Sequence, residues 1–272
     1  MRDHTHPVTP GESPTLTLDD GVVLCAPGGV YLPTERALVV ADLHAGYVAT
    51  LQKRGFTLPS QDDADLHARL RALLDRTDPA TVVIAGDLVH GAPALAARGG
   101  TPSPLAALLE VLSGRAVVVV PGNHDRAAVG WLMDRGVRTE VVHTVGPHTV
   151  VHGDGDPARL RGERALALAR GGRVILGHHH PALTLDDGAG ARARVPAFAH
   201  APGLLCLPAL TPRARGADLL RTDHAAELTE VVDPAELSLA VVVGQRVIPV
   251  GTLAQVRAVR SVRRTGRASS AG

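Results

Sequence analysis

Short runs of apolar residues alternate along the chain with longer segments in which apolar residues recur at helical spacing. Five of the runs predict buried strands, at residues 37–41, 82–85, 117–120, 150–151 and 173–176. Strands that alternate with helices are typical of an α/β fold, because each helix packs back onto a sheet. The pattern therefore predicts an α/β architecture for most of the chain.

Capping residues and turns mark further elements. Ser60 is placed to cap a helix that has Asp63 in its first turn, and Ser103 followed by Pro104 begins a second helix. Leucines form the apolar faces of both helices, at positions 66, 70, 73 and 74 in the first and 105, 108, 109 and 112 in the second. Hairpins are predicted at 15–25 and 241–250, whereas residues 186–196 are expected to form an exposed loop.

The two ends of the chain differ from its centre in composition. Residues 1–14 and 263–272 are rich in Pro, Gly, Ser and Arg, so we expect both ends to be disordered and residues 15–262 to form a single domain. The basic residues toward the C-terminus are Arg257, Arg260, Arg263, Arg264 and Arg267. They could contact an anionic polymer, but a solvated tail is the interpretation that such a charge run favours.

Composition and charge narrow the class of protein. Hydrophobic residues make up 45% of the chain and aromatic residues only 2%, so Val, Leu and Ala must fill the core. The formal net charge of +1 predicts no overall attraction to nucleic acid or membranes. Cys25 and Cys206 lie far apart and form no CxxC motif, which favours a reduced protein. Because there is no signal peptide and no run long enough to span a membrane, we expect a cytoplasmic protein.

Each of the five predicted strands runs into residues that can bind a metal ion. Ligands in open α/β sheets bind beyond the carboxyl ends of the strands, so we expect these side chains to converge at one edge. In the Asp-x-His and His-x-His segments the two outer side chains can face one cavity. In chain order the candidate ligands are Asp42, His44, Asp87, Asn123, His152, His178 and His180.

The chemistry of these donors suits a centre with two metal ions. Two carboxylates, one amide and four imidazoles, without a thiolate, favour Mn²⁺, Fe or Zn²⁺ over Ca²⁺. Seven groups are too many for one ion, but with Asp87 as a bridge they can hold two ions about 3.5–4 Å apart, the spacing used for phosphoryl displacement. Gly86, Gly122 and Gly177 precede the ligands, where tight turns need a residue without a β-carbon.

These residues make the chain resemble the calcineurin-like metallophosphoesterase superfamily. The motifs of that superfamily are D-x-H, G-D-x-x, G-N-H-D/E, a His before a small residue, and G-H-x-H, and all are present between residues 37 and 181. Residues 54–59, 86–91 and 177–181 are also similar to a bacterial subgroup, the DNA-ligase-associated metallophosphoesterases. The resemblance implies a four-layer sandwich of two mixed β-sheets flanked by helices, with the metals at the strand ends.

The resemblance also implies a role for each matching residue. One metal would be held by Asp42, His44, Asp87 and His180, and the other by Asp87, Asn123, His152 and His178. A hydroxide that bridges the two metals would attack the phosphate ester in line. His124 would contact the phosphate or protonate the leaving group, and Asp125 would orient His124.

Other polar residues near these motifs are weaker candidates for contacts with substrate. His90 could contact substrate, orient a ligand or be structural, and Arg54 could neutralise a phosphate or be an ordinary surface arginine. Arg213 and Arg215 could likewise neutralise a phosphate or be ordinary surface arginines, and they lie in a region where the sequence departs from that of the subgroup. His179 is expected to pack or to bond to the backbone.

Phosphodiester hydrolysis is the function that these observations favour, with Mn²⁺ as the expected metal and Fe, Zn²⁺ or Mg²⁺ as alternatives. A nuclease and a phosphomonoesterase are the alternative enzymes, although the scarcity of aromatic residues weakens a single-strand nuclease. A catalytically idle scaffold is disfavoured by the complete ligand set. The sequence does not decide whether the protein has an accessory role in DNA repair through protein partners. It also does not decide whether nucleic acid is a partner, or what the oligomeric state is.

Overall fold

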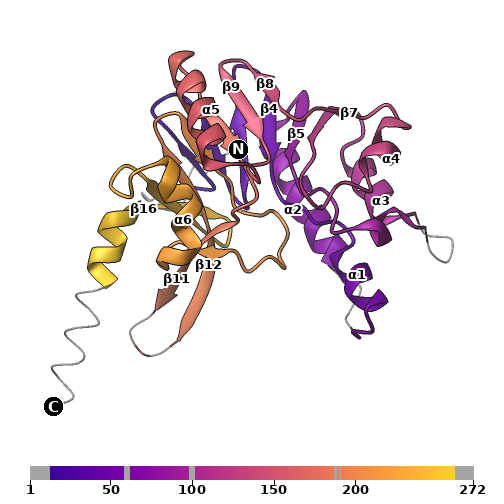
Figure 1. The fold of residues 1–272 in the computed structure, drawn as a ribbon. Helices are drawn as coiled ribbons and strands as arrows, with labels where there is room; N and C mark the ends of the chain where they lie inside the picture. The colour runs from indigo at the N-terminus through magenta and orange to yellow at the C-terminus, as the bar shows by residue number, and fades with distance from the viewer. Residues whose placement is uncertain (1–12, 58–61, 98–101, 187–188, 190, 261–272) are drawn as a thin grey trace, which may run out of the picture.

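The computed structural model describes residues 13–57, 62–97, 102–186, 189 and 191–260. In this part of the chain the strands form two sheets (Figure 1). The first sheet follows chain order and consists of β1 (Thr15–Thr17), β2 (Val23–Cys25), β3 (Gly29–Leu32), β4 (Ala37–Val40), β5 (Thr81–Ala85), β6 (Ala116–Val120) and β7 (Arg138–Thr139). Its strands are antiparallel up to β4 and parallel from β4 to β7, so the sheet is mixed.

The second sheet is also mixed, and its spatial order differs from its order in the chain. The strands are β8 (His143–Val145), β9 (His148–Val151), β10 (Val174–Leu176), β11 (Pro181–Asp186), β12 (Arg192–Ala201), β13 (Leu204–Cys206), β14 (Ala217–Asp218), β15 (Ser238–Val243) and β16 (Arg246–Thr252). They lie in the order β14, β11, β12, β13, β10, β9, β8, and β15 pairs with both β12 and β16. Both neighbours of β10, β9 and β13, run parallel to it.

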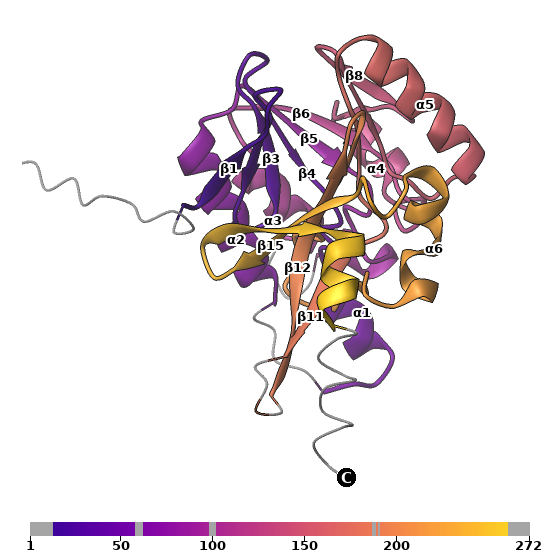
Figure 2. The ribbon, with the colours of Figure 1, turned by 90° about the vertical axis from the view of Figure 1, so that its left-hand side faces the viewer.

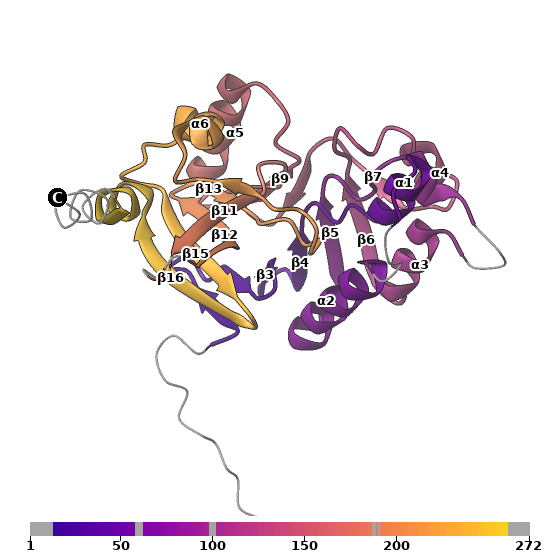
Figure 3. The ribbon, with the colours of Figure 1, turned by 90° about the horizontal axis from the view of Figure 1, so that it is seen from below.

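Helices cover the outer face of each sheet. The helices on the side of the first sheet are α1 (Tyr47–Lys53), α2 (Asp62–Thr77), the 3₁₀ helix η1 (Ala92–Leu95), α3 (Pro104–Val111) and α4 (Val129–Met133), whereas α5 (Pro157–Ala169) and α6 (Thr222–Val231) cover the second (Figure 3). This order of helix, sheet, sheet and helix confirms the predicted four-layer α/β sandwich. None of the described helices is both long and apolar enough to cross a membrane.

Three apolar cores lie between the four layers. Alternate residues of the parallel strands point to opposite faces, so Val39 of β4 enters the core between the sheets while Leu38 packs under α2 and α3. The third core joins the second sheet to α5 and α6. Phe198 is the largest fully buried side chain, and its neighbours between the sheets are almost all Val, Leu, Ile and Ala, as the composition predicts.

Most of the elements expected from the sequence are confirmed. The five buried strands are β4, β5, β6, β9 and β10, and the two hairpins are β1–β2 and β15–β16. Helix α3 begins where predicted, and the Ser103 hydroxyl accepts the N–H of Ala106 at 3.2 Å. The proposed cap Ser60, the tail at 263–272 and all but residues 13 and 14 of the N-terminal segment lie outside the described residues.

Residues 187, 188 and 190 of the loop predicted at 186–196 lie outside the described residues, and the prediction of a loop is wrong for Asp186 and for residues 192–196. These residues belong to the β11–β12 hairpin, which extends away from the body of the molecule (Figure 2). Leu183 pairs with Val195 near its base, and Asp186 forms an ion pair with Arg192 across its outer end at 3.2 Å. Cross-strand polar pairs rather than burial stabilise this part, so the sequence shows no alternation of apolar residues there.

Candidate metal centre

The carboxyl ends of strands from both sheets meet at one site. The loops after β4, β5 and β6 come from the first sheet, and the loops after β9 and β10 come from the second. The structure brings all seven candidate ligands together there: Asp42, His44, Asp87, Asn123, His152, His178 and His180. The side chains of Asp42, Asp87 and His152 are almost completely buried, whereas those of Asn123 and His178 line a cavity.

Asp87 is shared by two groups of possible ligands. Its carboxylate lies with His44 and His180 on one side and with His152 and His178 on the other. Asp87 Oδ2 is 3.8 Å from His44 Nε2, and Asp87 Oδ1 is 3.6 Å from His152 Nε2. The two oxygens of one carboxylate therefore face the two groups, as a bridging ligand requires.

Next to both groups, Asp42 has a buried carboxylate oxygen without a hydrogen bond, Oδ1, which lies 3.9 Å from His152 Nδ1. Asp42 Oδ2 lies 3.3 Å from His180 Nε2 and accepts the backbone N–H of His178 at 2.9 Å. Asp42 Oδ1 accepts no hydrogen bond from any residue that the structure describes. Such a buried oxygen is costly unless a cation or another donor satisfies it. Its environment thus fits a metal ligand.

In the second group the orientation of His152 is fixed from behind. Its Nδ1 lies 3.4 Å from the carbonyl oxygen of Ala85, which turns Nε2 toward the other ligands. His152 Nε2 is 3.2 Å from Asn123 Oδ1 and 3.2 Å from His178 Nδ1. Histidines that bind metals usually donate their second ring N–H to a carbonyl or carboxylate in this way.

Much of the site is built on unusual backbone. Only seven described non-glycine residues have a positive φ, and five of them are candidate ligands: Asp42, His44, Asp87, His178 and His180. Such conformations are costly for side chains other than glycine and persist where the surrounding structure enforces them, often at functional sites. The strained backbone is independent support for a functional centre at these strand ends.

The glycines before the ligands leave room for neighbouring ligands. A β-carbon on Gly86 would lie 1.7 Å from His152 Nδ1, one on Gly122 would lie 2.4 Å from Asp87 Oδ1, and one on Gly177 would lie 2.7 Å from Asp42 Oδ2. Gly86 also has a φ of 80°. Close approach of the loops, more than turn geometry alone, therefore explains these glycines.

Burial sets the protonation of several of these histidines. Burial, followed by the neighbouring His180 and His90, lowers the pKa of His44 to about 2. Burial and then His152 also lower the pKa of His178. Burial opposes protonation of His180 as well, but the hydrogen bond and charge of Asp42 outweigh it and raise that pKa. His44 and His178 are thus neutral at pH 7, which is the form that binds metals.

The side chain of His124 lies at the cavity, whereas that of Asp125 is buried in the loops. The backbone N–H of His124 donates to Asp87 Oδ1 at 3.0 Å, and its ring stacks on His90 with centroids 5.1 Å apart at the edge of the cavity. Asp125 is completely buried, and its carboxylate accepts the backbone N–H groups of Leu88, Val89 and Gly122. Its hydrogen bonds hold the two loops together and are not made to the His124 ring.

Five of the seven candidate ligands line a cavity of about 480 Å³, while Asp42 and His152 do not line it. His90 faces it, and its ring centroid is 4.4 Å from that of Tyr47, which also lines the cavity. Arg54 is exposed at the end of α1 and does not line the cavity, although its charge, after burial and His124, helps to lower the pKa of His90. Arg213 and Arg215 both reach the cavity.

Sequence reasoning missed Tyr47 and Thr211 as cavity residues. Tyr47 follows His44 closely at the start of α1, which could have identified it, whereas Thr211 carries no motif. His179 lies outside the cavity and its Nδ1 is 3.1 Å from Glu227 Oε2, so it packs against α6 through a side chain rather than through the backbone.

Comparison with known proteins identifies the class that this fold and site define. A family model described as calcineurin-like phosphoesterase matches residues 35–180, which is more than half of the chain and includes every candidate metal ligand. The chain belongs to this family, and its activity is that of a metal-dependent phosphoesterase.

The fold is also found in a solved structure. The chain is similar to the crystal structure of Pseudomonas putida nuclease MPE, with a TM-score of 0.61 and 23% sequence identity over 87% of this chain and 98% of that one. At this identity the likeness shows the shared fold. None of the curated proteins compared with the chain matches it.

Proposed function

We propose that this protein is a phosphodiesterase that works with two divalent cations, of which Mn²⁺ is the expected one. The observation that carries the proposal is the position of Asp87, whose two carboxylate oxygens face two separate groups of histidines. A single-ion site would leave one of these groups without a function.

The seven side chains divide into two sets of four that share Asp87. Asp42, His44, Asp87 and His180 would hold one cation, and Asp87, Asn123, His152 and His178 would hold the other. Mn²⁺ suits this set of donors, which offers the unbonded Oδ1 of Asp42 and neutral imidazoles and contains no thiolate. Fe, Zn²⁺ and Mg²⁺ are the alternatives. When bound, the two cations supply Lewis-acid activation of water and phosphate.

The protein's own residues would position the substrate and move a proton. His124 stands at the cavity with its backbone fixed by Asp87, so its ring is available to contact a phosphate oxygen or to protonate the leaving oxygen. Asp125 would position His124 indirectly, because it fixes the loop that carries it. His90 and the arginines at 213 and 215 would contact substrate from the cavity wall, and Arg54 would act at its rim.

A diester is favoured over a monoester by the surroundings of the centre. A diester continues on both sides of the phosphate, and the cavity is open toward arginine-lined surface rather than closed around a terminal phosphate. The structural neighbour is a nuclease, which is consistent with a nucleic-acid diester and with a link to DNA repair as in the DNA-ligase-associated subgroup. The alternative within the same centre is a phosphomonoesterase.

A matrix of metals and substrates tests this proposal. Protein stripped of metal and reloaded with Mn²⁺, Fe²⁺, Zn²⁺ or Mg²⁺ would be assayed on nitrophenyl monoesters and diesters, cyclic nucleotides and DNA. We expect diester turnover to be highest, and highest with Mn²⁺. Monoester turnover far above diester turnover would contradict the phosphodiesterase. Protein that purifies without stoichiometric metal and is inactive in every combination would point to a scaffold instead.

A further inference from the structure

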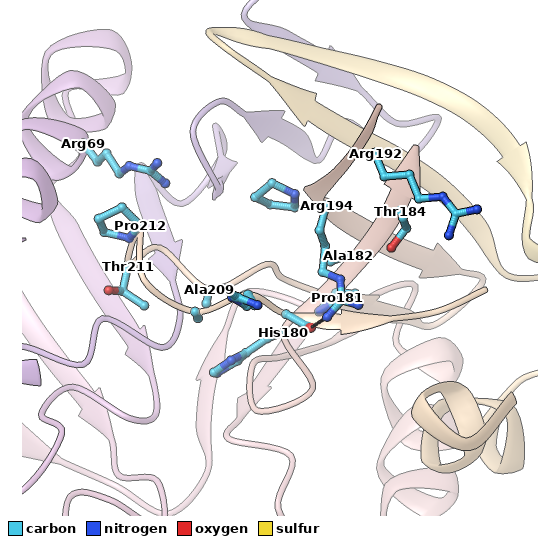
Figure 4. Close-up of a pocket in the computed structure, with 14 residues that line it drawn as sticks. Arg69, His180, Pro181, Ala182, Thr184, Arg192, Arg194, Ala209, Thr211 and Pro212 are labelled. Atoms are coloured by element: carbon cyan, nitrogen blue, oxygen red, sulfur yellow. Dashed lines mark hydrogen bonds between the residues drawn. The ribbon is translucent and has the colours of Figure 1, made fainter. Parts of the chain in front are cut away.

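The cavity at the metal centre is the first of three that adjoin one another. It shares Thr211, Ala214 and Arg215 with a second cavity of about 600 Å³, which runs along the β11–β12 hairpin (Figure 4). The second cavity in turn shares Arg192 and Arg194 with a third of about 880 Å³. A continuous groove therefore leads from the candidate ligands along the face of β12.

This groove, which we call the arginine groove, has a strongly positive lining. The described residues that line its second cavity include four arginines and no carboxylate. Those that line its third cavity include five arginines against two aspartates. The arginines of the groove are Arg69, Arg192, Arg194, Arg215, Arg221, Arg257 and Arg260. The local charge is thus very different from the formal net charge of +1 for the whole chain.

Backbone carbonyls hold several of these guanidinium groups without neutralising them. Arg194 donates to the carbonyl of Gly216 at 3.2 Å, and Arg257 donates to the carbonyl of Leu219 at 2.8 Å. Neither Arg194 nor Arg215 forms an ion pair with a carboxylate among the described residues. Fixed guanidinium groups of this kind are suited to bind phosphates, because their charge and remaining N–H donors are available.

The outer part of the groove lacks the aromatic platforms on which single-strand binders usually stack bases. Among the described residues that line its second and third cavities there is no Phe, Tyr or Trp. Thr211 adds a hydroxyl group that can bond to a phosphate oxygen. A ligand bound here would be recognised through its phosphates rather than through its bases.

We propose that the arginine groove binds the sugar–phosphate backbone of a nucleic-acid strand while one of its phosphodiesters lies at the metal centre. This inference rests on the proposed function, since it supplies the substrate class for the phosphodiesterase. A small diester would fill only the first cavity, whereas a polyanionic chain matches both the length and the charge of the groove. Binding is independent of base sequence and depends steeply on salt.

Two pairs of arginines allow a matched test. Arg192 is exposed and pairs with Asp186, while Arg194 is bonded to a backbone carbonyl. Outside the groove, Arg138 is exposed and pairs with Glu140, and Arg161 donates to the carbonyl of Glu230 at 3.0 Å. The double variants Arg192→Ala/Arg194→Ala and Arg138→Ala/Arg161→Ala therefore lose the same charge and the same kinds of contact.

Binding would be measured with Mn²⁺-loaded protein by fluorescence anisotropy, at several salt concentrations. The probe is a fluorescein-labelled oligonucleotide with a phosphorothioate backbone, which resists hydrolysis, and inorganic polyphosphate is a competing probe. We expect the groove variant to bind the oligonucleotide roughly 2- to 30-fold more weakly, on the scale of two lost ion contacts. The slope of log K against log salt should become shallower by about 1.4, since two phosphate contacts are lost. The control variant should bind like the native protein.

Hydrolysis of bis-nitrophenyl phosphate, which is too small to reach β12, separates the two proposals. The groove proposal would be overturned if the two double variants bound the oligonucleotide equally, or if the protein bound polyphosphate but not the oligonucleotide. If diester turnover were unchanged in that case, the proposed phosphodiesterase activity would still hold. Loss of oligonucleotide binding in the groove variant alone supports the groove. If the native protein then hydrolysed no diester, the proposed function would fail on its own.

Discussion

The carboxylate of Asp87 accepts the backbone N–H of His124 at 3.0 Å. The residue that faces both groups of ligands thus also fixes the position of the residue best placed to act on the substrate. Because this bond comes from the backbone, it survives any change of the His124 side chain. The contribution of the imidazole can therefore be measured without moving the loop.

Replacing His124 tests its role in the reaction. We expect His124→Ala to lower kcat for a diester with a poor leaving group, such as DNA, by about a hundredfold, within the range found for general acids and bases. The metal content should stay at the native level, because His124 belongs to neither of the two proposed sets of four; its ring lies with His44 and His90 in a third group that could hold an ion, and loss of one ion in His124→Ala would assign it to that group. Turnover of DNA at the native rate would remove His124 from the reaction, whereas the nitrophenyl diester, whose leaving group needs no proton, tests only the contact with the phosphate oxygen.

Asp125 should be important for stability. Its buried carboxylate accepts three backbone N–H groups from two loops, and an asparagine would turn an N–H toward at least one of them. A buried donor without a partner costs about 1–3 kcal/mol, so Asp125→Asn should lower the free energy of unfolding by at least roughly 1–3 kcal/mol. Urea denaturation measures this, with the exposed Asp134→Asn as control. A loss no larger than that of the control would show that these bonds contribute little.

Gly86 and Gly114 provide a comparison of two glycines with the same backbone. Both have a φ of 80°, but a β-carbon on Gly86 would overlap His152 Nδ1, whereas one on Gly114 would meet nothing within 4 Å. Alanine should therefore cost about 1 kcal/mol of backbone strain at either position. Only Gly86→Ala should also displace His152 and lower metal content and diester turnover. Equal metal content in the two variants would mean that the absence of a β-carbon at Gly86 does not determine the position of His152.

The ion pair between Asp20 and Arg173 connects the β1–β2 turn to the start of β10, and it predicts a pH dependence of stability. Burial alone would raise the pKa of Asp20, but the hydrogen bond and charge of Arg173 outweigh it, so the pKa is lowered. A lowered folded pKa stabilises the fold above the unfolded pKa of about 4, and this stabilisation disappears as the pH falls through the folded value.

Asp20→Asn should accordingly destabilise the protein at pH 7 by at most about 1 kcal/mol, since the pair is partly exposed. The difference from the native protein should narrow toward zero as the pH is lowered below 4. Urea midpoints of both proteins between pH 7 and pH 3 measure it, and Asp134→Asn again serves as the control. A difference that grew on acidification would contradict the predicted direction of the pH dependence.

The sequence predicts which candidate ligands come together, because metal chemistry restricts such candidates to a few residue types at the ends of strands. Asp42 and His152 follow an apolar run directly, and Asp87 follows one after a single glycine, so the predicted strands also place them. Their positive φ values, where they occur, could not be predicted, because the packing of loops from two sheets imposes them. The family motif predicts that Asp125 orients a side chain, but its partners are N–H groups that no motif reveals.

The arginine groove shows where sequence reasoning stops. Arg69, Arg194 and Arg215 come from α2, from β12 and from the segment before β14, and each alone looks like an ordinary surface arginine. They line one cavity only because the β11–β12 hairpin forms over residues expected to be a loop. The net charge of the chain, +1, conceals this local excess of positive charge, since acidic residues elsewhere in the chain balance it.

The most direct test of the central claim is the metal content of Asp87→Asn. Asparagine keeps an oxygen that can accept the His124 N–H but loses the charge that two cations would share. We expect close to two Mn²⁺ per native chain, about one in His178→Gln, and less than one in Asp87→Asn, with diester turnover of Asp87→Asn lower by about a thousandfold. An Asp87→Asn protein that retained two ions and native turnover would contradict the binuclear centre.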